Sequence, residues 1–288
     1  MQLAEVYFAR FSHTSARQQV KAALTLSPQS PEAHLLLGNI LSEEHNLPAA
    51  EAEFKKALEL KPDYPEVYVA LGFHYLEHHH KTDEEIEKLF KKALLLKPGM
   101  IQAYLGLGRF YSSILELEKA KKILQKALKL QPDLPLAHIF LGEIYFRQKN
   151  LEKSEYHYKE AVRLARQNPL TYFELGEFYY DQRKYSQAIK AYKKGELANP
   201  QNPFSIYGAH QVLAQIYLSR GELKKARKEI NQLYQLNPQD SPTLALLGES
   251  FLLEDNLKEA EFYFEKALKI NPELRKNIRN DPELASFL

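Results

Sequence analysis

The 288-residue chain contains no cysteine and no tryptophan, and it has only 11 glycines. The lack of cysteine excludes disulfides, thiolate metal ligands and a cysteine nucleophile. No segment reaches the roughly 18 consecutive apolar residues of a membrane span, and the N-terminus lacks the pattern of a secretory signal. Gly-rich phosphate loops, nucleophile elbows and zinc-protease helix motifs are also missing. We therefore expect a cytoplasmic protein that is not an enzyme and needs no cofactor.

The chain also lacks an excess of charge of either sign. Lys and Arg number 39 and Asp and Glu 37, so the formal net charge is +2. This balance gives no general reason to expect nucleic acid or an anionic membrane as the partner. Hydrophobic residues make up 44% and charged residues 26%, which is typical of a folded domain rather than a disordered one.

A short motif recurs along the chain: an aromatic residue, His or Leu, then Leu-Gly three residues later, then an aromatic residue or Leu. Its small residues are Gly38, Gly72, Gly108, Gly142, Gly176, Ala214 and Gly248. Successive positions differ by 34, 36, 34, 34, 38 and 34 residues, a regularity that chance does not produce. The two longer intervals place insertions of two residues near 78–83 and of four residues near 203–206.

Each unit has a second half with its own pattern, exemplified by Ala50, Phe54, Ala57 and Pro62. Apolar residues three and four apart predict helices. Small residues such as Gly38 let two helices approach closely, and proline ends the second helix because it lacks a backbone donor. Each unit is therefore predicted to be a pair of packed helices joined by a polar turn.

These motifs resemble the tetratricopeptide repeat, and the resemblance covers nearly the whole chain. It implies an all-α fold, a right-handed superhelical solenoid of helix-turn-helix repeats. We expect repeats at residues 31–64, 65–100, 101–134, 135–168, 169–202, 203–240 and 241–274, with insertions in the second and sixth. Residues 1–30 are expected to form a partial N-terminal repeat and residues 275–288 a C-terminal capping helix, which covers the last apolar face.

The resemblance further implies that the first helix of each pair lines a concave groove. The residues expected to contact a partner there are Leu35, Asn39, Val69, Phe73, Leu105, Arg109, Ile139, Glu143, Phe173, Glu177, Tyr180 and Gln211. The row is apolar with acidic residues in its middle. It therefore predicts a protein or peptide partner that carries apolar and basic residues, extended or as an amphipathic helix.

Two known ligand classes of the family are not expected. Recognition of a chaperone C-terminal carboxylate needs Lys and Asn on one first helix, Asn on the next, and Lys with Arg on the third. The corresponding places hold residues such as Leu35 with Asn39, then Ala70, then Gln102 and Gly106, and no other three successive repeats fit. The Asn ladder of glycosyltransferase-type repeats is missing as well. A similar period occurs in pentatricopeptide-type RNA readers, but these are more basic, and we expect no nucleic-acid ligand.

Two other features have a functional and a structural interpretation. His74 and His78–His80 could place two imidazoles one helical turn apart, as a metal site needs, but no acidic or Cys partner stands at a diagnostic spacing. A polar turn is the favoured interpretation. Lysine clusters such as Lys193-Lys194 and Lys224-Lys225 lie on second helices and alternate with Glu. They are interpreted as solvated faces with helix-supporting ion pairs.

The leading hypothesis is a non-catalytic scaffold or adaptor with no direct membrane insertion, from a bacterial source. The alternative is a regulatory or targeting portion of a larger chain that carries an enzyme or a membrane anchor. The short first helix of the partial repeat at residues 1–30 motivates this alternative. A stand-alone enzyme is a third, weaker hypothesis.

Overall fold

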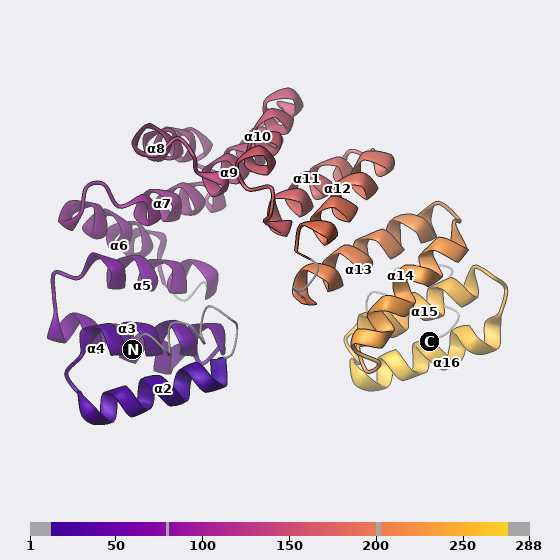
Figure 1. The fold of residues 1–288 in the computed structure, drawn as a ribbon, viewed down its shortest axis with the longest axis horizontal. Helices are drawn as coiled ribbons and strands as arrows, with labels where there is room; N and C mark the ends of the chain where they lie inside the picture. The colour runs from indigo at the N-terminus through magenta and orange to yellow at the C-terminus, as the bar shows by residue number, and fades with distance from the viewer. Residues whose placement is uncertain (1–12, 79–80, 200–202, 276–288) are drawn as a thin grey trace. The chain divides into compact units, whose positions relative to one another are not determined.

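A computed structural model describes residues 13–78, 81–199 and 203–275, with no strand among them. These ranges contain fifteen helices, whose arrangement can be followed in Figure 1. They are α2 (His13–Leu26), α3 (Pro31–Glu43), α4 (Leu47–Leu60), α5 (Pro65–His78), α6 (Asp83–Leu96), α7 (Ile101–Ser113), α8 (Leu117–Leu130), α9 (Pro135–Arg147), α10 (Leu151–Leu164), α11 (Pro169–Asp181), α12 (Tyr185–Ala198), α13 (Pro203–Ser219), α14 (Leu223–Leu236), α15 (Ser241–Leu252) and α16 (Leu257–Ile270).

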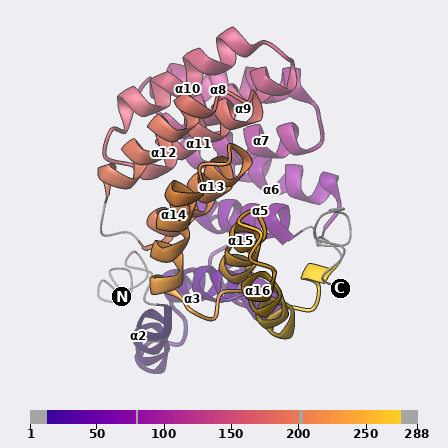
Figure 2. The same cartoon turned by 90° about the vertical axis from the view of Figure 1, so that its right-hand side faces the viewer.

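The chain divides into an N-terminal unit, residues 1–150, and a C-terminal unit, residues 151–288. In the N-terminal unit α3 packs on α4, α5 on α6 and α7 on α8, and each second helix also packs on the first helix of the next pair. The C-terminal unit repeats this order from α10 to α16 (Figures 1 and 2). First helices of successive pairs also touch, α3 to α5 to α7 to α9, and α11 to α13 to α15. The predicted helical solenoid is therefore confirmed.

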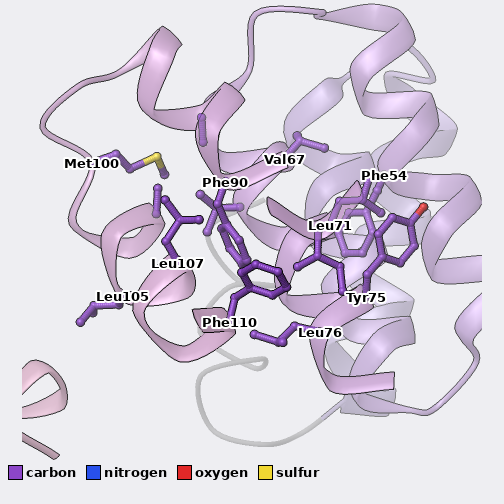
Figure 3. Close-up of a cluster of buried hydrophobic side chains, with 14 of the residues drawn as sticks. Phe54, Val67, Leu71, Tyr75, Leu76, Phe90, Met100, Leu105, Leu107 and Phe110 are labelled. Carbon is purple, nitrogen blue, oxygen red and sulfur yellow. The ribbon is translucent and has the colours of Figure 1, made fainter. Parts of the chain in front are cut away.

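In five of the pairs, the core forms where a ring or Leu from the second helix meets a glycine on the first. A Cβ added to Gly38 would lie 2.6 Å from Phe54 Cε1, and one added to Gly108 would lie 2.5 Å from Leu124 Cδ2. Figure 3 shows the cluster around Phe90, whose Cε1 would lie 2.8 Å from a Cβ added to Gly72. Helices at such short separation require the residue without a side chain at this place.

The turns inside the pairs share one backbone conformation. Positive φ angles of 55–67° occur at His45, Leu115, Lys149, Arg183, Asp255 and Gly221, each just after a first helix. The next residue donates its N–H to the carbonyl five residues earlier, as from Asn46 to Leu41. This left-handed cap closes the helix end and sets the short link to the second helix.

The two predicted insertions lie in or beside segments that the structure describes only in part. The four-residue insertion near 203–206 coincides with a first helix, α13, of 17 residues, against 13 in α11. Residues 79–80, within the predicted two-residue insertion, lie outside the described residues. So do residues 1–12 of the expected partial repeat and all of the expected capping helix after Arg275.

Candidate partner-binding surfaces

A hollow of about 550 Å³ lies against α3, α5 and the segment that begins α7. We call it the N-terminal hollow. Four of the residues predicted to contact a partner line it: Leu35, Asn39, Val69 and Phe73. Met100 adds a further apolar wall, and Glu43, Glu66, Glu77 and Lys97 stand around it. The hollow thus combines an apolar floor with charged groups at its edge.

Ion pairs neutralise much of the charge at this edge. Arg109 Nη1 of α7 lies 2.9 Å from Glu77 Oε1 of α5, and Lys97 Nζ lies 3.1 Å from Glu66 Oε1. On α9, Arg147 Nη2 lies 2.7 Å from Glu143 Oε1. Two residues predicted to contact a partner, Arg109 and Glu143, are therefore engaged within the chain itself. A ligand that used these charges would have to compete with existing partners.

Other residues of the predicted set are covered by the chain. Leu105 on α7 and Ile139 on α9 are only 8% and 5% exposed, and Val69 is 6% exposed although it borders the hollow. Leu105 lies at the margin of the cluster in Figure 3. These side chains fill the contacts between successive first helices, so they offer little surface to a partner. Sequence position alone does not separate the two roles, because both fall on the same helical stripe.

In the C-terminal unit, the exposed carboxylates of α11 have a different environment. Glu177 and Asp181 stand one turn apart, and Tyr192 Oη donates a hydrogen bond of 2.6 Å to Glu177 Oε2. Among the residues that the structure describes, no Lys, Arg or His forms an ion pair with either carboxylate. Partial burial and the neighbouring Glu177 raise the pKa of Asp181. We call Glu177 and Asp181 the α11 carboxylates.

The remaining predicted residues of this unit are Phe173 and Tyr180 on α11 and Gln211 on α13. Burial and the acidic neighbours raise the pKa of Tyr180, whose ring lies 5.9 Å from that of Tyr185. Gln211 is half-buried on α13. The Phe173 ring stacks on Tyr192 at 5.7 Å and occupies the space that a Cβ on Gly195 would need. Phe173 is thus held mainly by its own helix pair, and the sequence signal for this was Gly195, where most repeats have alanine.

The histidines form no metal site within the described part of the chain. The rings of His45, His74 and His78 lie 5.2–5.7 Å apart, and Ser42 Oγ is 2.8 Å from His74 Nδ1. No group of three or more potential ligands converges among the described residues. His79 and His80 lie outside them.

Comparison with protein-family models gives matches to tetratricopeptide-repeat models along the chain. They cover residues 7–72, 101–134, 142–183, 173–241 and 241–274. A comparison with the sequences of curated proteins gave no match. No helix of the described residues is long and apolar enough to cross a membrane.

Several solved structures have a similar fold. Yeast Tom70 has a TM-score of 0.69 at 19% identity, covering 96% of this chain and 61% of Tom70. The Cut9–Hcn1 hetero-tetramer of the APC/C gives 0.66 at 18% identity, covering 99% of this chain and 54% of the other. Human IFIT1 with PPP-AAAA has a TM-score of 0.60 at 21% identity, and the match covers 90% of this chain and 68% of IFIT1. The chain therefore spans little more than half the length of Cut9 and Tom70.

Proposed function

Since the chain belongs to the tetratricopeptide-repeat family, we propose that it is a non-catalytic scaffold that binds a segment of a partner protein on the first-helix side of its repeats. The segment carries Lys or Arg together with apolar residues. A cytoplasmic location is part of this proposal. The observation that carries the partner chemistry is the pair of exposed α11 carboxylates, with which no cation of the described residues forms an ion pair.

Physical chemistry favours a basic segment at this place. Partial burial, and then repulsion from Glu177 one helical turn away, raise the pKa of Asp181, so both effects disfavour the charged carboxylate. An incoming ammonium or guanidinium group relieves the repulsion and forms charge-assisted hydrogen bonds. Neighbouring Tyr180 supplies a ring for the aliphatic part of a Lys or Arg side chain or for an apolar anchor. An acidic partner, such as a chaperone tail or the phosphates of RNA, would meet like charge here.

The alternative is that this array is the regulatory or targeting portion of a larger protein. This chain matches only 54% of the chain from the Cut9–Hcn1 structure and 61% of Tom70. These two proteins therefore extend beyond the part that resembles this chain, and this supports the alternative. Both hypotheses use the same binding surfaces. They differ only in what else the chain is attached to.

Selection from a random peptide display library tests the partner chemistry. We expect wild-type protein to enrich peptides with Lys or Arg next to apolar residues. The variant Glu177→Gln with Asp181→Asn keeps hydrogen-bond acceptors but removes both charges, and it should lose this enrichment. The control Glu259→Gln with Glu261→Gln removes the same charge from exposed positions of α16 and should retain it. Enrichment of acidic peptides, or equal enrichment by both variants, would refute the proposal.

A further inference from the structure

Three contacts between successive pairs share a Tyr–Glu–Lys arrangement on the second-helix side. The fifth residue of the second helix is Glu, which receives a hydrogen bond from a Tyr of the next first helix and an ion pair from a Lys four residues later. The groups are Tyr75–Glu51–Lys55, Tyr111–Glu87–Lys91 and Tyr179–Glu155–Lys159. The three Lys Nζ atoms lie 2.6, 2.8 and 2.7 Å from the Glu oxygens. In each group a carboxylate neutralises the lysine.

The contact between α12 and α13 departs from this arrangement. Its fifth residue is Ile189, so Lys193 has no carboxylate at the equivalent place. Lys193 Nζ instead lies 5.8 Å from the centre of the Tyr217 ring, and Lys225 Nζ of α14 lies 5.6 Å from the same ring. Two cations from successive second helices are thus brought to one aromatic side chain. Loss of the glutamate leaves positive charge where three other contacts are neutral.

Exposed lysines continue along both helices. They are Lys190, Lys193 and Lys194 on α12, and Lys224, Lys225 and Lys228 on α14. Only Lys225 has an ion pair, 2.6 Å from Glu222 Oε2, among the described residues. The two carboxylates on these helices lie near His210 instead: Glu229 Oε2 is 2.7 Å from its Nδ1 and Glu196 Oε1 is 4.0 Å from its Nε2, and among the described residues neither forms an ion pair with a lysine of these helices. We call these six lysines the α12–α14 lysine face. The near-zero net charge of the chain conceals this local excess.

We propose that the α12–α14 lysine face binds the surface of an anionic lipid bilayer. Clusters of four to eight cations on amphipathic helices attract anionic headgroups. Leu197, 77% exposed, lies on the same stripe as Lys190, Lys193 and Lys194 and can enter the headgroup boundary. The face presents no exposed aromatic ring for stacking bases, because Tyr192 and Tyr217 are 3% and 4% exposed. These features favour lipid over single-stranded nucleic acid.

Co-sedimentation with vesicles tests this assignment on the full chain. The protein should sediment with phosphatidylglycerol–phosphatidylcholine vesicles at low salt, remain in solution with phosphatidylcholine alone, and be released by added salt. Neutralising Lys190, Lys194 and Lys228 to Gln should weaken partitioning by on the order of a hundredfold, from the usual contribution of a lysine near an anionic surface. The matched control changes Lys88, Lys92 and Lys126, which are exposed on α6 and α8, to Gln. This control should change partitioning to the vesicles little.

A second variant tests whether the missing glutamate at position 189, and not only the number of lysines, determines vesicle binding. Ile189→Glu places a carboxylate beside Lys193, as in the three Tyr–Glu–Lys groups, and should weaken vesicle binding severalfold while circular dichroism remains unchanged. Equal losses in the two triple variants would overturn the assignment, as would no binding to anionic vesicles. Binding of poly-glutamate or single-stranded RNA without vesicle binding would overturn it in favour of an acidic polymer.

Discussion

The N-terminal hollow and the α11 carboxylates occupy equivalent sides of their repeats but differ in how their charges are matched. Around the hollow, Glu77 and Glu66 are paired with Arg109 and Lys97. On α11, Glu177 and Asp181 have no such ion pair with any residue of the described part of the chain. Exposed ion pairs contribute little to stability, so the difference concerns recognition rather than folding. A cationic ligand displaces an existing partner at the hollow, whereas at α11 it supplies one that is missing.

The largest effect is expected from a substitution that disrupts the N-terminal hollow and leaves α11 intact. Gly38→Leu forces a side chain against Phe54, which lines the hollow, where even a Cβ would lie 2.6 Å from the ring. Overpacking of this kind costs about 1–3 kcal/mol of unfolding free energy. Thermal and urea unfolding should show this loss, while basic-peptide binding at α11 persists. Gly99→Ala, where nothing lies within 4 Å, is the control. Equal stability of the two variants would contradict the tight helix contact.

Charge reversal on α11 should have the next largest effect. Glu177→Lys with Asp181→Lys replaces attraction by repulsion and should weaken a basic peptide by roughly tenfold to a hundredfold, since each close charge contributes on the order of 1 kcal/mol at a protein surface. Fluorescence anisotropy measures this directly. Retained affinity would show that the α11 carboxylates do not contact the peptide.

A smaller effect should appear when the hollow is made to resemble α11. Arg109→Gln releases Glu77 from its 2.9 Å ion pair. Affinity of the hollow for a basic peptide should then rise severalfold, in line with the 0.2–1 kcal/mol of exposed ion pairs. The measurement is best made in the Glu177→Gln, Asp181→Asn background, where α11 no longer competes. An unchanged or lower affinity would contradict the role assigned to charge pairing.

The dependence on pH should distinguish Asp181 of the α11 carboxylates from Glu87, a carboxylate that is paired with a lysine. The pKa of Asp181 is raised, so its proton is bound more tightly in the folded protein than in the unfolded chain. Its carboxyl therefore stabilises the fold at low pH and loses that contribution as pH rises through its raised pKa. Binding of a basic peptide should weaken as pH falls through that pKa, and Asp181→Asn should flatten this part of the profile. An identical profile for the variant would exclude Asp181 as the titrating group.

Glu87 should behave in the opposite way. Its pKa is lowered, chiefly by the hydrogen bond from Lys91 and then by Tyr111. Its contribution to stability is present above the ordinary range of a glutamate and is lost as pH falls through the lowered pKa. Glu87→Gln should therefore reduce the acid-side loss of stability in unfolding experiments. No change in that loss would argue against the Tyr–Glu–Lys contact.

The fold could be predicted from the sequence because its determinants are local and repeated. A glycine equivalent to Gly38 recurs in six of the seven repeats, and so does a proline equivalent to Pro62, so most copies reinforce one interpretation. The candidate sites were harder to predict from the sequence. Whether Leu105 is buried, or Arg109 already paired, depends on residues about one repeat away in sequence. The replacement of a repeated glutamate by Ile189 was visible in the sequence, but its meaning required the positions of Tyr217 and Lys225.

Photo-crosslinking of a display-selected basic peptide to the full chain, with the contacted residues identified by mass spectrometry, tests the central claim most directly. A photoreactive group beside the peptide's lysine should label residues on α11 around Glu177 and Asp181, and labelling should fall when both carboxylates are neutralised. Labelling confined to the N-terminal hollow or to the second helices, unaffected by that neutralisation, would contradict the claim that unpaired carboxylates select the partner.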